Sequence, residues 1–376
     1  MELVFASRRI EKLCNSEKEN AATRYRYEPD YAVPPGATLQ ETIDALGIDQ
    51  RELAIRTGLS AKHINQIIKG HAPITHDTAL RMERVTGVPA RMWNNLEANY
   101  REQLARRAEK ARLQHDLAWL RSIPTRELIS RGAIEPTTDK AELLKAVLGF
   151  FGVATVEAWK QGWSAPQFAF RRSLAFKGKA GPMATWLRWG ELAAQEIDCQ
   201  PFDTSTFVGA LREIRALTVG EPGTFVPRMV ERCAASGVAL VFVQEIQGAP
   251  VSGAAKWITP SKAMICLSLR GKSNDRFWFT FFHEAGHILT DSKKDVFIDV
   301  DCEGDSRESQ ADRFAADFLI PERYHEELRG LTTYPAVESF ARRIGIAPGI
   351  VVGRLQREGI IRYNQLNRLK ERLRWG

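Results

Sequence analysis

The sequence predicts a mainly α-helical fold with a small α+β part: a helical bundle near the N-terminus, a helical middle and a mixed C-terminal domain. Apolar residues recur at helical spacing over most of residues 38–220. Short runs rich in β-branched and apolar residues come later, at 238–244 and 263–269. They are followed by a long apolar helical segment that ends near residue 287 and another at 307–319, so the strands lie among helices.

Length and composition indicate a soluble protein of two or three domains, with 376 residues, 44% hydrophobic and 26% charged. The longest apolar run, near 277–282, is far shorter than the roughly 20 residues of a membrane span, and the N-terminus lacks a signal peptide's apolar core. We therefore expect a cytoplasmic protein with no membrane partner. The net charge of +7 suits a nucleic-acid partner without establishing one.

The cysteines are odd in number and include no C-x-x-C pair. This argues against both a disulfide framework and a cysteine-ligated zinc, and we expect small core residues. They are Cys14, Cys199, Cys233, Cys266 and Cys302.

The first element in chain order is an extension over residues 1–37. It begins with the strand-like MELVFA, continues as a charged stretch and ends in Pro34-Pro35-Gly36. No helix crosses such a sequence, so we place a boundary there.

Residues 50–70, QRELAIRTGLSAKHINQIIKG, have the spacing of a helix-turn-helix. Ala54 allows close packing of the second helix, and Gly58 turns the chain four positions later. Ile64 and Ile67 would anchor the third, recognition helix to the core. The pattern predicts a DNA-binding module.

The recognition helix has a good N-cap in Ser60 and a good terminator in Gly70. Amide and cationic side chains on its outward face can meet base edges or phosphates. The residues on or near that face are Ala61, Lys62, His63, Asn65, Gln66 and Lys69. The alternative is a helical hairpin with a solvated polar face.

Over residues 27–100, YEPDYAVPPGATLQETIDALG through MWNNLEANY, the chain resembles the HigA-type antitoxins of the XRE repressor superfamily. The resemblance covers the helix-turn-helix and its flanking helices. It implies a five-helix domain that binds operator DNA as a dimer, often at its own promoter. It also implies that Gln50 contacts backbone phosphate, while Lys62, His63 and Gln66 face the major groove.

The middle of the chain, residues 108–222, keeps helical spacing but contains no catalytic motif. Prolines interrupt the pattern at Pro124, Pro136, Pro166 and Pro182. We expect a helical linker region.

The strongest chemical signal is His283-Glu284-Ala285-Gly286-His287. Two histidines at i and i+4 lie on one face of a helix, so both imidazoles can bind one Zn²⁺. Glu284, between them, can take a proton from a water molecule bound to that metal. The preceding FWFTFF makes the helix apolar all round, which predicts burial. The alternative is two core histidines satisfied by carbonyl groups. The motif predicts a zincin-like HExxH peptidase domain.

A catalytic zinc takes a third protein ligand and keeps one position open. In ESQADRFAADFLIP, an apolar stripe runs along one helix face, and Glu308 and Asp312 fall on that face. Glu308 lies 21 residues after His287 and is our third ligand, with Asp312 orienting a ligand imidazole. Alternatively, Glu308 favours only the positive end of a helix dipole. Further carboxylates lie in a loop at Asp301, Glu303 and Asp305.

RFWFTFFHEAGHIL followed by ESQADRFAADFLIP resembles the ImmA/IrrE-type metallopeptidases, which pair HExxH with a downstream E-x-x-A-[ND]-x-F-A. The resemblance extends over about 150 residues, from SGVALVFVQ to IGIAPGIVVGRLQREGII, and matches at His283, Glu284, His287 and Glu308. It implies cleavage of a repressor or antitoxin under stress. Tyr324 and His325 are both candidates for the group that stabilises the oxyanion, and no sequence spacing decides between them.

Residues 1–25 resemble the opening strand and helix of HigB/RelE-type toxins, without the toxin's later strands. We therefore expect a toxin-like remnant with no ribonuclease activity. The predicted division is an extension over 1–37, a helix-turn-helix domain over 38–107, a linker over 108–222 and a peptidase domain over 223–376.

The last 40 residues are predicted to be helical and basic. Such a charge run is usually a solvated helix face. The narrower interpretation is a small lobe that docks a substrate or faces DNA. Its cations include Arg342, Arg343, Arg354, Arg357, Arg362, Arg368, Lys370, Arg372 and Arg374.

Together these features predict a dimeric DNA-binding regulator whose zinc endopeptidase domain cleaves a regulatory protein, a repressor, an antitoxin or the chain itself. The competing hypothesis is a repressor or antitoxin whose zinc domain senses or scaffolds without proteolysis. Glu284 favours the first, because a structural zinc needs no general base beside it.

Overall fold

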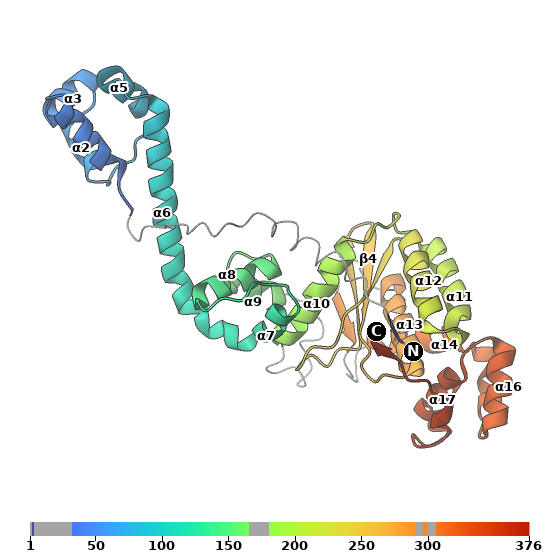
Figure 1. The fold of residues 1–376 in the computed structure, drawn as a ribbon. Helices are drawn as coiled ribbons and strands as arrows, with labels where there is room; N and C mark the ends of the chain where they lie inside the picture. The colour runs from blue at the N-terminus through green and yellow to red at the C-terminus, as the bar shows by residue number, and fades with distance from the viewer. Residues whose placement is uncertain (1, 4–31, 165–179, 291–295, 300–305, 376) are drawn as a thin grey trace. The chain divides into compact units, whose positions relative to one another are not determined.

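The computed structural model describes residues 2–3, 32–164, 180–290, 296–299 and 306–375 (Figure 1). These residues form two compact units. One comprises 32–117, and the other comprises 118–375 together with strand 2–3. The predicted toxin-like remnant, residues 1–25, lies outside the described residues apart from 2–3.

The first unit is an all-helical bundle (Figure 1, blue to teal). Its helices are α2 (Pro35–Ala45), α3 (Gln50–Thr57), α4 (Ala61–Ile68), α5 (His76–Thr86) and α6 (Ala90–Asp116). Side-chain caps start three of them: Asp49 accepts the amide of Glu52, Ser60 that of His63, and Thr75 that of Thr78.

The bundle closes around one apolar core. Trp93, Leu39 and Met82 are fully buried in it, together with Ile64 and Ile67 of α4. The two isoleucines therefore anchor α4 as predicted. Pro35 corrects the expected boundary: it begins α2 instead of preceding it, because proline is well suited to a first helical turn.

The second unit begins with helices that precede its sheet. They are η2 (Leu117–Ser122), α7 (Thr125–Ser130), α8 (Lys140–Phe151), α9 (Val156–Ser164), α10 (Ala180–Gln195), α11 (Thr204–Ala216), η5 (Leu217–Val219) and α12 (Pro222–Ala235). Of the expected breaks, Pro124 immediately precedes α7. Pro182 instead lies inside the first turn of α10, where its missing amide costs nothing, and Pro166 is outside the described residues.

The sheet of this unit has four strands in the order β2-β4-β3-β5. They are β2 (Val238–Phe242), β3 (Gly253–Thr259), β4 (Lys262–Leu267) and β5 (Val296–Asp299). β2 and β4 are parallel, while β3 runs antiparallel to both β4 and β5. The sequence predicted β2 and β4 but neither β3 nor β5; Gly253 and two alanines give β3 little intrinsic strand preference.

In the sequence, one further helix precedes β5 and the others follow it. They are α13 (Asn274–Thr290), α14 (Ser306–Leu319), η6 (Glu322–Tyr324), α15 (His325–Leu328), α16 (Tyr334–Ile344), α17 (Pro348–Arg357) and η7 (Asn367–Leu369). The fold is thus mainly α-helical with a small sheet, as the sequence predicted.

The predicted helical tail ends at Arg357. Gly359 adopts a positive φ of 72° that does not continue a helix, and turns, η7 and strand β6 (Arg374–Trp375) follow. β6 pairs in parallel with β1 (Glu2–Leu3). The tail is therefore folded onto the unit and is not one solvated helix.

Two expectations from composition can be compared with the structure. Cys233 and Cys266 are buried, and Cys199 is half-buried; all three are free thiols. Cys14 and Cys302 lie outside the described residues. Among the helices of the described ranges, none is long and apolar enough to cross a membrane.

Candidate metal centre and nucleic-acid interface

The HExxH motif lies in the second half of α13, a helix buried on nearly every side. Phe281 and Phe282 are fully buried, and Trp278 is 1% exposed. His283 and His287 are 3% and 2% exposed, so neither imidazole is solvated. Their side chains must find partners inside the protein.

Helix α14 supplies those partners, because it approaches α13 closely at a glycine. A Cβ on Gly286 would lie 3.1 Å from a ring carbon of Phe314 and 3.3 Å from the Cα of Ala311. The predicted apolar stripe of α14 is buried, with Ala311 and Ala315 fully inaccessible. This packing directs Glu308 toward the two histidines.

Three ligand atoms converge as a result. His283 Nε2 lies 3.1 Å from His287 Nε2 and 3.1 Å from Glu308 Oε2. His287 Nε2 lies 3.6 Å from Glu308 Oε1. Ligands of one tetrahedral zinc at about 2.0–2.1 Å lie about 3.3 Å from each other, so the separations fit a shared Zn²⁺.

Glu308 is charged in this environment. Burial alone raises its pKa, but hydrogen bonds and charges from His283 and His287 outweigh burial and lower the pKa from 4.5 to about 2. The carboxylate form is the one that ligates a metal.

Asp312 lies one helical turn after Glu308, on the other edge of His283. Its Oδ1 is 3.0 Å from His283 Nδ1, and its Oδ2 pairs with Arg357 of α17. Asp312 is thus placed where a carboxylate could orient the His283 imidazole, the role that the sequence proposed for it. The sequence had indicated Arg357 only as one of the cations of the tail, and its contact with Asp312 was not predicted.

Glu284 of α13 is fully buried, and its side chain lies against Gly253 at the start of β3. A Cβ on Gly253 would lie 2.6 Å from Glu284 Oε1, so only glycine leaves the carboxylate its space. Burial raises the pKa of the Cys266 thiol well above its usual value, and the Glu284 charge raises it further. Cys266 therefore stays neutral beside Glu284.

The other predicted groups are placed differently. Tyr324 packs edge-on against Phe340, with ring centroids 5.7 Å apart, and His325 Nε2 lies 3.5 Å from Asp317 and 3.1 Å from Arg354. The described contacts link neither residue to the histidine pair. The loop carboxylates at 301, 303 and 305 lie outside the described residues.

The helix-turn-helix surface is formed by α3 and α4. Gly58 ends α3 with a positive φ of 69°, which makes the turn that the sequence predicted. Lys62 and Lys69 are exposed, whereas His63 and Gln66 are half-buried.

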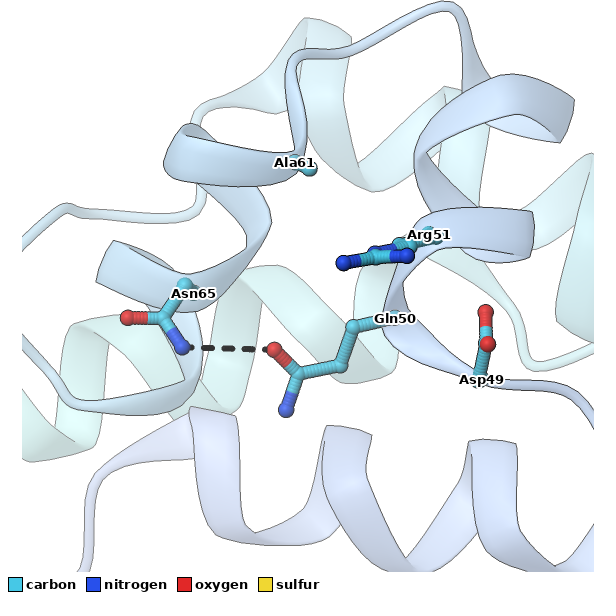
Figure 2. A pocket seen from close by; sticks show the side chains of 5 residues that line it. All are labelled: Asp49, Gln50, Arg51, Ala61 and Asn65. Carbon is cyan, nitrogen blue, oxygen red and sulfur yellow. Dashed lines mark hydrogen bonds between the residues drawn. The ribbon is translucent and has the colours of Figure 1, made fainter.

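A shallow hollow lies between the first turns of α3 and α4 (Figure 2). Gln50 extends across it and accepts a hydrogen bond from Asn65 at 3.3 Å. The amide of Gln50 donates in turn to Gln40 of α2 at 2.8 Å. The exposed Arg51 lies at the same hollow (Figure 2) and was not among the predicted contacts.

Two family models match the chain. Residues 39–93 match a helix-turn-helix family, and residues 239–356 match the IrrE N-terminal-like domain of the M78 peptidase family. Arg357 lies just beyond the second matched range.

Two curated relatives each match about a fifth of the chain or less. A virulence-associated protein I of Dichelobacter nodosus is 35% identical over 75 residues, which are 20% of this chain and 69% of that protein. An uncharacterized helix-turn-helix-type transcriptional regulator of Escherichia coli (strain K12) is 30% identical over 63 residues, 17% of this chain and 67% of its own length.

Solved structures similar to this chain include antitoxin HigA of Pseudomonas aeruginosa with its promoter, at 28% identity and a TM-score of 0.22 over 23% of this chain and 94% of that one. An addiction module antidote protein of a HigA family from Coxiella burnetii is 26% identical over 22% of this chain and 92% of its own, with a TM-score of 0.21. By its family-model matches and its two curated relatives, the chain belongs to the XRE-type helix-turn-helix family through its N-terminal unit and carries an IrrE-like M78 peptidase-family domain in its C-terminal part.

Proposed function

We propose that this protein is a DNA-binding transcriptional regulator with a zinc-dependent endopeptidase domain, and that the peptidase cleaves a regulatory protein: a repressor, an antitoxin or this chain itself. The convergence of His283, His287 and Glu308 beside the buried Glu284 carries the proposal. This arrangement occurs in the same chain as a helix-turn-helix domain.

The donor set fits zinc. Two imidazoles and one carboxylate match the three protein ligands of catalytic zinc sites, with a fourth position left for water or substrate. His283, His287 and Glu308 would hold the ion. When bound, Zn²⁺ lowers the pKa of water and polarises the scissile carbonyl.

Glu284 would perform the proton transfers. Its carboxylate accepts a proton from the attacking water as the oxygen adds to the peptide carbonyl carbon. It then donates that proton to the departing nitrogen as the C–N bond breaks. Its buried position favours this role, because bulk water is excluded there and does not exchange protons with the carboxylate between the two transfers.

Purified full-length protein tests the peptidase. We expect about one zinc per chain, loss of stoichiometric zinc in His283→Ala, and retained zinc with lost cleavage in Glu284→Gln. Cleavage is followed by mass spectrometry on candidate repressors, on the chain itself and on a proteome-derived peptide library. Equal cleavage by Glu284→Gln and wild type would refute the peptidase, and zinc without cleavage would favour a sensor or scaffold.

For the first unit we propose binding to operator DNA as a homodimer. Lys62 and Lys69 are exposed on or beside α4, so they can neutralise phosphates, while Gln66 and His63 lie on the same helix. Gln50 and Asn65 hold each other through a hydrogen bond and would present their remaining polar atoms toward the duplex.

Fluorescence anisotropy with the promoter DNA of the protein's own gene tests this. Binding should weaken steeply with salt, and Lys69→Ala should reduce the salt slope by about one. Gln66→Ala should relax sequence preference more than Lys69→Ala does, because amides read base edges. A footprint over one asymmetric half-site would contradict the dimer.

A further inference from the structure

Arg357 connects the C-terminal lobe, residues 346–375, to the candidate metal centre. Its guanidinium pairs with Oδ2 of Asp312, whose Oδ1 is 3.0 Å from Nδ1 of His283. It also lies 5.3 Å from the centre of the Phe279 ring, and Phe279 lies 6.2 Å from the His283 ring, centroid to centroid. Arg357 thus contacts two of the side chains that surround His283, Asp312 and Phe279.

The backbone that carries Arg357 is firmly placed. A Cβ on Gly349 of α17 would lie 2.4 Å from Asn274 Oδ1, and one on Gly353 would lie 2.8 Å from Asp275 Oδ2. Two glycines one turn apart therefore let α17 pack directly on the first turn of α13. Arg357 is one further turn along α17, where it reaches α14.

Hydrogen bonds and an ion pair hold the end of the lobe against the first turn of α13 and against α17. The backbone N–H of Asn274 donates to the backbone carbonyl of Glu371 at 2.9 Å, and the backbone N–H of Glu371 donates to the side-chain Oδ1 of Asn274 at 3.2 Å. Lys370 pairs with Asp275 at 2.6 Å and donates to the buried Gln356 at 2.7 Å. The tail therefore fixes the position from which Arg357 extends.

We propose that Arg357 is a positioning residue for the metal centre: it holds the Asp312 carboxylate against Nδ1 of His283, so that Nε2 of His283 faces His287 and Glu308. This inference rests on the proposed metal site. It gives the basic tail a task different from substrate docking or DNA contact, because the cation acts through a carboxylate inside the protein.

A simple surface ion pair is the competing explanation, since the Arg357 side chain is 62% exposed and such pairs contribute little. The two explanations differ in what removal of Arg357 does. Without it, Asp312 is free to turn toward solvent, and His283 loses its orientation. A surface pair would leave the imidazole unchanged.

Zinc affinity of the full chain, measured by chelator competition, separates them. We expect Arg357→Ala to weaken zinc binding by about tenfold, the lower end of the usual effect of a residue that orients a ligand. Arg357→Lys should recover part of the loss, because lysine keeps the charge but not the planar, stacking guanidinium. In an Asp312→Ala background, Arg357→Ala should cause no further loss.

Arg343→Ala is the matched control. Arg343 is also exposed, paired with Glu327 and close to two aromatic rings, Tyr324 and Phe340, but it lies on α16 and its described contacts are away from the histidines. The zinc affinity of the Arg343→Ala variant should equal that of the wild type. Equal losses in Arg343→Ala and Arg357→Ala would overturn the proposal, as would an undiminished affinity in Arg357→Ala.

A metal-free measurement separates this inference from the proposed function. The ring resonances of His283 should form one sharp set in wild type and Arg343→Ala, and several or broadened sets in Arg357→Ala. If wild type binds no zinc, the proposed metal centre is wrong, and the resonances still decide whether Arg357 positions His283. Identical spectra for wild type and Arg357→Ala would refute the positioning role.

Discussion

Gly36 controls how closely α2 approaches α4, the proposed recognition helix. A Cβ at this position would lie 2.3 Å from both the carbonyl oxygen of Ile67 and the Cα of Ile68. Ordinary contacts begin at 3.4 Å, so Gly36→Ala requires the two helices to separate by roughly 1 Å. The obstacles are backbone atoms, which no side-chain rotation moves away.

The expected cost is about 2–3 kcal/mol, the upper part of the range for overpacked cores. The gain in helix propensity from glycine to alanine, at most about 1 kcal/mol, is smaller in a first turn and does not compensate. Because each 1.4 kcal/mol is a factor of ten, opening of the unit should become roughly 30–150 times more frequent.

Hydrogen exchange of peptides from α4, measured by mass spectrometry, tests this increase in opening, because protected amides exchange only when the unit opens. Gly209→Ala is the control: its helical position has nothing within 4 Å of an added Cβ. Exchange in α4 should accelerate only in Gly36→Ala. Unchanged exchange there would show that the close approach of α2 and α4 does not stabilise the unit.

Three further predictions concern the second unit. Gly253→Ala should displace the Glu284 carboxylate by about 0.8 Å, the difference between 3.4 and 2.6 Å, and lower any peptidase rate by about 100-fold while zinc content stays at the wild-type level. In the metal-free protein, the stability that the Glu308 charge contributes is present above pH 4.5 and is lost as the pH falls toward about 2, so urea unfolding of wild type and Glu308→Gln should differ at pH 6 and converge near pH 2. Arg215→Met should cost about 2–4 kcal/mol in denaturant unfolding, because Arg215 donates to the carbonyls of Phe318, Leu319 and Ile344 at the ends of α14 and α16. The exposed Arg232, paired with Glu213, is its control, and Arg232→Met should cost under about 1 kcal/mol.

Local chemistry made several features of this protein predictable from sequence. The i, i+4 spacing of His283 and His287 places both imidazoles on one helix face in any environment. Ser60 and Gly58 define the start of α4 and the turn before it through their own hydrogen-bonding and conformational preferences. Glu308 was predictable as well, because an acidic side chain on an apolar helix face needs a partner.

Tertiary structure decided what depends on contacts between distant segments. β3 has weak intrinsic strand preference and forms because β4 and β5 supply its hydrogen bonds. The contact of Arg357 with Asp312 joins residues 45 positions apart in sequence. Their helices, α17 and α14, both pack on α13, and each of these close contacts depends on a glycine. Sequence patterns report the periodicity and caps of single elements, whereas the space between elements is set by packing. The two histidines, Glu308 and Asp312 could therefore be singled out from the sequence, and the contact of Arg357 with Asp312 could not.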